Sequence, residues 1–200
     1  DAERIAALGR LLDEFGQEFV DLVELIRSHS GTRDRLETTG VLNPKVARDL
    51  GVVGIAGRAS GIDRDLRRDF PHDFYDQVIF TVPVFTEGDV QRRLAVRREE
   101  VYQSISIIRQ ALGKLPDGPH RTVVGEVPPD RVAIGFTEGW RGEILHWIHT
   151  APGNRLARCK VKDPSLQNWP ALSEAIIGNI IPDFPVVNKS FNLSYSGTDR

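Results

Sequence analysis

The sequence predicts an α+β fold that is mainly helical, with a core of long bundled helices and a small antiparallel β-meander. Two long segments carry apolar residues at intervals of three and four, which is the pattern of an amphipathic helix. A later segment has β-like runs separated by turn residues. Among the 200 residues, 40% are apolar, with nine Phe and three Trp. This content is enough for one domain, residues 1–200, to bury a core.

The first long helix is predicted over residues 2–29, where apolar residues fall on one face and Gly31 stops the pattern. Asn43 is the expected N-cap of a short helix that has Pro44 at its first position. This helix is expected to run to about residue 50.

Residues 51–71 are rich in glycine and charge and fit no period, so they predict a loop with a short turn of helix. Residues 78–84 have strand composition, although Pro83 limits pairing. Thr86 is the expected cap of the second long helix, over residues 88–112. Its expected buried positions are Val90, Leu94, Val101, Ile105, Ile108 and Leu112. Both helices have apolar faces too wide for water, so we expect them to pack together as the main core.

The sheet is predicted over residues 132–162 as an antiparallel meander beside this core. Its turns are expected at residues 138–141 and 152–154, where glycine and proline interrupt the apolar runs. A third helix is predicted over residues 169–180, with Asn168 or Ser165 as its cap.

Composition excludes several classes of protein. The formal net charge is −2 with both signs mixed along the chain, which argues against a nucleic-acid partner. The only cysteine, Cys159, excludes a disulfide framework and a cysteine-based zinc or iron–sulfur site within this chain. No apolar run has membrane-spanning length and no signal peptide opens the sequence, so we expect a soluble, cytosolic chain without a transmembrane segment. The chain has no Met and begins inside a helical pattern, which suggests a fragment of a longer protein.

Two arginine-bearing stretches are candidate sites. Arg58, beside Asp63 in the glycine-rich stretch, belongs either to a solvated charge cluster or to a loop that turns selected charges inward. Gly57 and Gly61 allow the tight turns that the second interpretation needs. Arg141 lies between glycines at the expected hairpin turn and is either an exposed residue or a permanent cation facing a cleft.

Other chemistry finds little support in the residues. The five histidines do not cluster with acidic residues at metal-binding spacing, and His146 and His149 fall on opposite faces of a strand. The sequence also lacks the serine-hydrolase, phosphate-loop and dinucleotide-binding motifs. The residues alone therefore do not name an activity.

Five stretches carry a resemblance: GVVGIAGRASGIDRDLRRDFP, EGDVQRRLAVRREEVYQSISII, EGWRGEILHW, CKVKDPSLQNWPAL and IIGNIIPDFP. They resemble the large-subunit family shared by respiratory complex I and the membrane-bound nickel–iron hydrogenases, and the resemblance extends over almost the whole chain. In complex I this is the quinone-site subunit, and in the hydrogenases it carries the metal centre. The sequence KDPSLQNWPAL resembles the hydrogenase branch more than complex I itself.

The C-terminal NLSYSGTDR departs from that family in one respect. The hydrogenase branch typically ends this segment with Asp-Pro-Cys-x-x-Cys-Thr-Asp-Arg, and its two thiolates bind nickel and iron. Ser194 and Gly197 occupy the two cysteine positions here. A hydroxyl is a poor ligand for a soft metal and glycine offers no side chain, so we expect no metal in this segment.

The resemblance also implies a site, partners and a location. Arg141 matches the arginine of an E-x-x-R-G motif that points at the metal pocket, and Arg58 and Asp63 match the stretch that lines it. We therefore expect Arg141 and the Ser194–Gly197 segment to flank one polar cavity, with Arg141 paired to Asp63 or Asp199 because a buried arginine needs a carboxylate or a ligand. The implied partners are an iron–sulfur subunit and membrane-arm subunits, peripheral on the cytoplasmic side of the inner membrane.

Three functions follow from the resemblance. The first is an electron-transfer subunit of a complex I-like NADH:quinone oxidoreductase or hydrogenase-like complex. Quinone and the iron–sulfur clusters of partner subunits would then be the cofactors, and this fragment would hold none. The second is a non-catalytic scaffold descended from a hydrogenase large subunit. The third, a working nickel–iron hydrogenase, is disfavoured because the ligand thiolates are missing.

Overall fold

The computed structural model describes residues 2–116, 118–119, 121–123 and 125–198. It is mainly helical with one antiparallel sheet, as the sequence predicts. The helices are α1 Ala2–Ser28, α2 Ser30–Asp34, α3 Pro44–Asp49, α4 Gly54–Ala59, α5 Leu66–Asp69, α6 Val90–Gly113, α7 Pro164–Ala175 and α8 Phe184–Phe191. Two 3₁₀ turns, η1 Tyr75–Gln77 and η2 Ile181–Asp183, complete the helical part.

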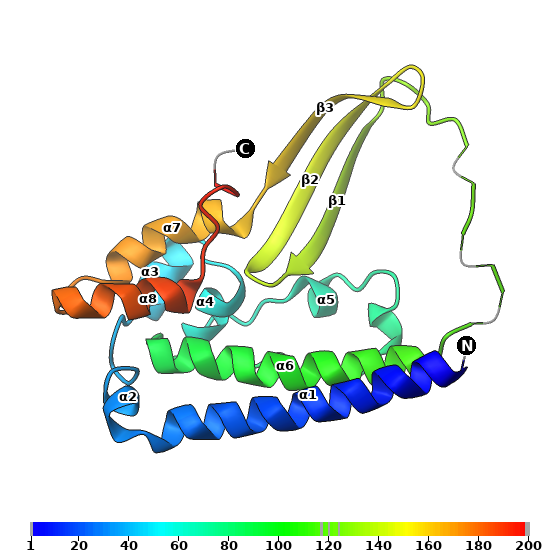
Figure 1. The fold of residues 1–200 in the computed structure, drawn as a ribbon. Coiled ribbons are helices and arrows are strands. Elements are labelled where there is room, and N and C mark those ends of the chain that lie inside the picture. Colours follow the sequence, from blue (N-terminus) through cyan, green and yellow to red (C-terminus); the bar gives the residue numbers. More distant parts are fainter. Residues whose placement is uncertain (1, 117, 120, 124, 199–200) are drawn as a thin grey trace.

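The sheet has the order β1-β2-β3, with β1 Val132–Gly139, β2 Gly142–Ala151 and β3 Arg155–Lys162. Both pairs of strands are antiparallel, with Gly139 opposite Gly142 at the first turn. The predicted meander and its two turns are therefore confirmed. Figure 1 shows the strands rising away from the helices, with the β1–β2 turn at their base near α4 and α5.

The two long helices lie side by side and run in opposite directions (Figure 1). Phe19 of α1 meets the ring of Tyr102 of α6 edge to face, at 6.1 Å between centroids. Asp13 pairs with Arg109 further along the two helices. These contacts confirm that α1 and α6 pack together.

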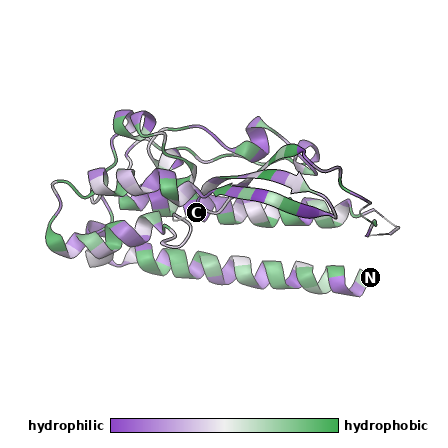
Figure 2. Cartoon of the chain, turned by 90° about the horizontal axis from the view of Figure 1, so that it is seen from above, coloured by the Kyte–Doolittle hydropathy of each residue, from purple (hydrophilic) through white to green (hydrophobic). Residues whose placement is uncertain are grey.

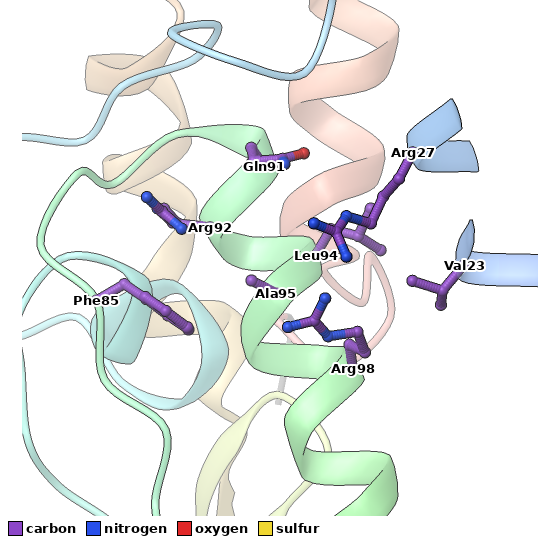
Figure 3. Close-up of a pocket in the computed structure, with 8 residues that line it drawn as sticks. All are labelled: Val23, Arg27, Phe85, Gln91, Arg92, Leu94, Ala95 and Arg98. Atoms are coloured by element: carbon purple, nitrogen blue, oxygen red, sulfur yellow. The ribbon is translucent and has the colours of Figure 1, made fainter. Parts of the chain in front are cut away.

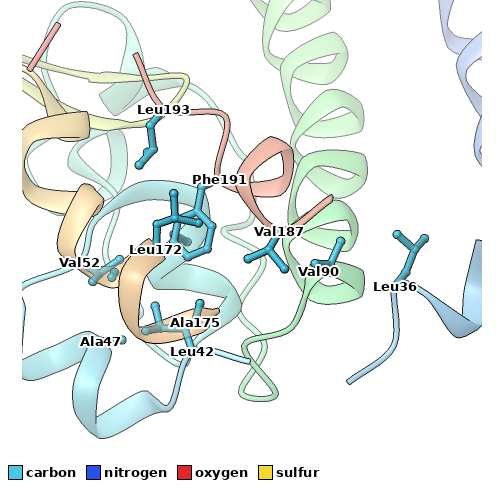
Figure 4. Close-up of a cluster of buried hydrophobic side chains, with 12 residues drawn as sticks. Leu36, Leu42, Ala47, Val52, Val90, Leu172, Ala175, Val187, Phe191 and Leu193 are labelled. Carbon is cyan, nitrogen blue, oxygen red and sulfur yellow. The ribbon is translucent and has the colours of Figure 1, made fainter. Parts of the chain in front are cut away.

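The main core nevertheless lies elsewhere, so that part of the expectation is wrong. Its buried members come from α3, α4, α7, α8, the start of α6 and the segments that join them, and none lies on α1 (Figure 4). Along α6 the buried residues are Val90, Arg93, Val96 and Glu100, so half of them are charged. Glu100 belongs to the ion pairs described below, whereas Arg93 donates to Ser190 and to two backbone carbonyls. Ile108, an expected core residue, is 39% exposed.

Helix α1 carries a second apolar stripe that faces solvent. Leu8, Leu11, Phe15, Leu22 and Leu25 follow a spacing of three and four and are between 37% and 67% exposed. Hydrophobic positions accordingly run along much of α1 in Figure 2. The wide apolar face that the sequence shows on this helix is thus divided between contact with α6 and open surface.

Three local expectations are corrected by the structure. Residues 78–84 form no strand, because side chains of α6 bind their backbone: Gln110 bonds both backbone groups of Ile79 and Gln103 accepts from Thr81 N–H. Asp89, not Thr86, caps α6 by accepting from Arg92 N–H at 2.7 Å. Helix α7 starts earlier than expected because Asp163 caps it, accepting from Ser165 N–H at 2.7 Å.

The other expected elements are confirmed with small differences. Asn43 caps α3 through Lys45 N–H at 2.8 Å, and Pro44 is its first residue. The glycine-rich stretch 51–71 contains two short helices, α4 and α5, rather than one turn.

Gly54 is the position where the close packing of α4 on the sheet can be tested. Its φ is +64°, and an added Cβ would overlap the backbone carbonyl of Arg141. We expect Gly54→Ala to lower the free energy of unfolding by about 3 kcal/mol or more, because conformational strain and a backbone clash combine. Urea unfolding of the purified chain measures this.

Gly9→Ala is the matched control. Gly9 lies inside α1 with open space around it, so alanine there should stabilise the chain by about 0.5–1 kcal/mol. A Gly54→Ala variant as stable as the wild type would contradict the described contact between α4 and the hairpin turn.

Candidate functional site

The Ser194–Gly197 turn follows α8 and folds against the start of α7. Ser194 N–H donates to the hydroxyl of Ser165 at 3.0 Å, and the hydroxyl of Ser194 accepts from Gly197 N–H at 3.0 Å. Thr198 donates to the carbonyl of Ser194 and accepts from the indole of Trp169 at 2.7 Å. The turn is therefore held by bonds of its own and by α7.

The residues of this turn do not fit a thiolate-bound metal. A Cβ added to Gly197 would lie 2.6 Å from a carboxylate oxygen of Asp163, the residue that caps α7. A cysteine there would have to displace the cap, and the Ser194 hydroxyl is a poor soft-metal ligand. Throughout the described part of the chain, no group of three or more His, Cys, Asp or Glu is placed to hold a metal ion.

Arg141 lies in the β1–β2 turn, where four parts of the chain meet. Its Nε donates to the backbone carbonyl of Asn192, two residues before Ser194. Its own carbonyl lies against Gly54 at the start of α4. The buried amide of Asn168 on α7 bonds both backbone groups of Val53, at 3.0 and 3.1 Å, and so fixes the chain that enters α4. Arg141 thus lies close to the Ser194–Gly197 turn, as the resemblance implies, while the polar cavity between them stays a prediction.

The partner expected for Arg141 is not the one observed. Asp63 is 63% exposed and pairs with Arg68 at 2.6 Å, away from Arg141. Asp199 lies outside the described residues. Arg141 binds a carbonyl at the C-terminal end of α8, where cations are favoured by the helix dipole and by unpaired carbonyls.

Arg58 is almost completely buried, with 1% exposure of its side chain. It contacts three carboxylates from three other segments: Glu100 of α6 at 2.6 Å, Glu138 of β1 at 3.0 Å and Asp65 before α5 at 3.6 Å. It also donates to the carbonyl of Arg64 at 3.1 Å. The loop therefore does turn selected charges inward, but Arg58 and Asp65 are the residues selected rather than Asp63.

The charges of this cluster do not balance within it. Arg67 adds a second cation by binding Asp65 at 2.6 Å, so two guanidinium groups face three carboxylates. Burial raises the pKa of Glu138 above its usual value, and the negative charge of Asp65 adds to this, while Arg58 opposes it. Glu138 therefore holds a proton more readily than a carboxylate in water does.

Arg97 links the cluster to Arg141. Burial lowers the pKa of Arg97 to about 10, the charge of Glu100 raises it, and the charge of Arg141 lowers it further. Its guanidinium also lies over the ring of Trp140, at 5.9 Å from the centroid. A continuous set of charged groups thus runs from Arg58 to the C-terminal end of α8.

The residues that the sequence did not single out are Asp65, Glu100, Glu138 and Asn168. Glu138 had a usable signal, because it is the first residue of the same E-x-x-R-G motif as Arg141 and precedes the turn. Glu100 had none, since it lies within a run of charges on α6 that is typical of a solvated face.

A separate pocket of about 100 Å³ lies between α1 and α6 and is lined by Val23, Arg27, Phe85, Gln91, Arg92, Leu94, Ala95 and Arg98 (Figure 3). Its three arginines are paired with Glu24, Glu87 and Glu99. These charges are already neutralised by local partners, so this pocket is not the candidate site.

Comparison with known proteins identifies the family. The fold and the site are those of the large-subunit family shared by complex I and the membrane-bound hydrogenases. A family model described as "Respiratory-chain NADH dehydrogenase, 49 Kd subunit" matches residues 1–127 and 120–200. The chain belongs to this family.

Its relatives include subunits of hydrogenases and of NADH-quinone oxidoreductases. The chain is 35% identical to formate hydrogenlyase subunit 5 of Escherichia coli over 96% of its length and 34% of that protein. It is 35% identical to the carbon monoxide-induced hydrogenase of Rhodospirillum rubrum, over 90% of the chain and 50% of that protein. It is 29% identical to an NADH-quinone oxidoreductase subunit of Rickettsia typhi, over 96% of the chain and 57% of that protein.

A solved structure has the same fold. The chain superimposes with a TM-score of 0.89 and 26% identity on a chain of the membrane-bound sulfane sulfur reductase, an archaeal respiratory membrane complex, covering 98% of this chain and 55% of the other. The chain thus spans between about a third and three fifths of the relatives it matches. In the part of the chain that the structure describes, no helix is long and apolar enough to cross a membrane.

In the Arg58 cluster, replacing a charged residue by uncharged glutamine is predicted to have a large effect at Arg58 and a small one at Glu138. Arg58→Gln leaves three buried carboxylates facing only Arg67, so the free energy of unfolding should fall by about 3–5 kcal/mol. Glu138→Gln leaves two cations facing two carboxylates and should change it by less than about 1.5 kcal/mol. Urea unfolding of both variants at neutral pH measures the difference.

The pH dependence of stability tests Glu138 independently. The folded chain binds the Glu138 proton more tightly than the unfolded chain, so ionisation of Glu138 costs stability as the pH rises from its ordinary pKa through its raised folded pKa. Glu138→Gln removes this cost, so its stability relative to the wild type should improve with rising pH. A relative stability that instead worsens with pH would show that ionised Glu138 is favoured in the fold.

Proposed function

We propose that this chain is the C-terminal part of an electron-transfer subunit in a membrane-associated respiratory complex, of the NADH:quinone oxidoreductase-like or hydrogenase-like type. The observation that carries the proposal is the Ser194–Gly197 turn. It keeps its place beside Arg141 while Gly197 has no room for the thiol side chain that a metal would need. The subunit then works without nickel or iron ligands from this segment.

The relatives' names support the assignment of this chain to a respiratory or hydrogenase-type complex. They are subunits of hydrogenases, of NADH-quinone oxidoreductases and of a sulfur-reducing respiratory membrane complex. By analogy, this chain would be a peripheral subunit on the cytoplasmic side of the inner membrane. Its partners would be an iron–sulfur subunit and membrane-arm subunits, and quinone would be the candidate electron acceptor.

This chain's own residues would supply positioning and charge. Arg141 presents a fixed cation held by Nε, and within the described part of the chain its two terminal nitrogens donate no hydrogen bond, so they can meet an electron-rich ligand. Glu138, three residues away, is the group suited to hold or release a proton because burial raises its pKa. Reduction of a quinone consumes protons as well as electrons, so a cation and a protonatable carboxylate three residues apart in the chain fit that chemistry.

The alternative is a non-catalytic scaffold, and one observation favours it. Arg58 forms ion pairs with carboxylates of other segments, and Arg141 caps a helix end, so each also has a structural role. In that case the charged residues would persist because the fold needs them.

Metal content tests the absence of ligands. We expect the full-length protein, purified in its complex and washed with chelator, to contain less than about 0.1 nickel per copy, because neither ligand position in this segment can bind it. Elemental analysis of the complex gives the value. About one nickel per copy would overturn the metal-free assignment.

Activity of an Arg141 variant separates the two functions. Arg141→Gln keeps hydrogen-bond donors but removes the charge, so an electron-transfer role predicts a loss of quinone reduction of about 10²-fold, the scale of one positioned electrostatic group. Arg141→Lys, which keeps the charge, should retain more activity. Subunit content by gel analysis is the control, and full activity with Arg141→Gln would favour the scaffold.

A further inference from the structure

One face of the sheet combines an apolar edge with a basic edge. Side chains alternate between faces along each strand, so the strand register assigns this face. Val132, Ile134 and Phe136 of β1 lie beside His149, Trp147 and Leu145 of β2, which lie beside Arg158, Lys160 and Lys162 of β3. We name these nine residues the cationic sheet face.

This face is open along most of its length. Val132 is 58% exposed, Ile134 is 65% exposed and Phe136 is 40% exposed. Within the described chain, the ring contacts to this face from outside the sheet are those of Phe70 and His72 with Phe136, near the base. A small antiparallel sheet normally buries one face against another layer, so branched aliphatic side chains in water here indicate a surface that receives a partner.

The charge of the sheet differs from that of the chain. Residues 131–162 contain six basic and two acidic residues, although the whole chain has a formal net charge of −2. Lys162 pairs with Glu143 at 2.9 Å. Among the described residues, no carboxylate forms an ion pair with Arg158 or Lys160. These two cations are therefore available to a partner that carries negative charge.

We propose that the cationic sheet face docks an amphipathic helix of another protein chain. The apolar side of that helix would cover Val132, Ile134 and Trp147, and acidic residues along one flank would meet Arg158 and Lys160. The outer strands of a three-stranded sheet are about 10 Å apart, which matches the diameter of one α-helix. The inference rests on the proposed function in one respect, because it assumes that the partner is a subunit of the same complex.

The distribution of charge favours a helix over a polyanionic surface. The cations of this face lie on β3 alone, while β1 is aliphatic and aromatic. A nucleic acid or an anionic membrane would be met by cations spread across the face, since phosphate groups contact a broad area. A helix with one acidic flank matches a face that is basic along a single edge.

Cross-linking in the intact purified complex tests the charged edge. A carbodiimide joins an amine directly to a carboxylate, so Lys160 should be linked to an Asp or Glu within a helical segment of another subunit, located by mass spectrometry. Lys160→Arg is the matched control, because it keeps the charge and the bound subunit but loses the cross-link. The double variant Arg158→Glu/Lys160→Glu should lower retention of that subunit at least tenfold, with the circular dichroism of the chain unchanged.

Maleimide labelling tests the apolar edge, in a Cys159→Ser background because Cys159 is itself exposed. Ile134→Cys should react at least tenfold more slowly in the complex than in the isolated chain. His146→Cys, exposed on the opposite face, should react at similar rates in both. Equal reactivity of Ile134→Cys in both states would overturn the inference, as would Lys160 cross-links only within this protein or to a second copy of it. The inference would also be overturned if this protein released the partner subunit and bound vesicles containing phosphatidylglycerol in its place.

The two proposals fail in different ways. A stable multisubunit complex in which Ile134→Cys stays reactive would overturn the docking surface alone. Purification of the full-length protein without any other subunit would overturn the proposed function and the docking surface together.

Discussion

The buried guanidinium of Arg58 is the interaction on which the arrangement of the site depends. It draws carboxylates from α6, from the approach to α5 and from the end of β1 to one point inside the protein. A buried guanidinium is costly without carboxylate partners, so separating these segments would leave a buried charge uncompensated. The cluster fixes the base of the sheet together with the contacts of the hairpin turn with Gly54 and Asn192. Because Glu138 lies just before the β1–β2 turn, the same contact also places Arg141.

Next to the Arg58 cluster, short-range packing brings the Ser194–Gly197 turn to Arg141. Gly54 allows α4 to touch the hairpin turn, Asn168 fixes the segment that enters α4, and Asn192 presents its carbonyl to Arg141. The Ser194–Gly197 turn then closes on its own hydrogen bonds and on the cap of α7. A site built in this way holds a cation and a protonatable carboxylate, while Ser194 and Gly197 offer no thiolate. The proposed electron-transfer role rests on that combination.

Features set by local patterns could be predicted from the sequence, and features set by distant partners could not. The ranges of α1 and α3, the meander and both of its turns follow from periodicity, caps and turn residues. The strand predicted over residues 78–84 is absent because two glutamine side chains of α6, more than 20 residues further along the chain, accept hydrogen bonds from its backbone. The inward turn of Arg58 was one of two open interpretations, but its carboxylates lie on other elements, and no local pattern distinguishes Glu100 or Asp65 from surface charges. The resemblance to a family located Arg141 near the tail without identifying its carbonyl partner.

An experimental map of the intact complex, obtained by cryo-electron microscopy, tests the metal-free site most directly. We predict that the hydroxyl of Ser194 accepts from Gly197 N–H, that Asp163 caps α7 beside Gly197, and that Arg141 reaches the carbonyl of Asn192. We also predict no metal density bonded to Ser194. A metal bound between the Ser194–Gly197 turn and Arg141, with Asp163 displaced from its cap, would contradict this assignment.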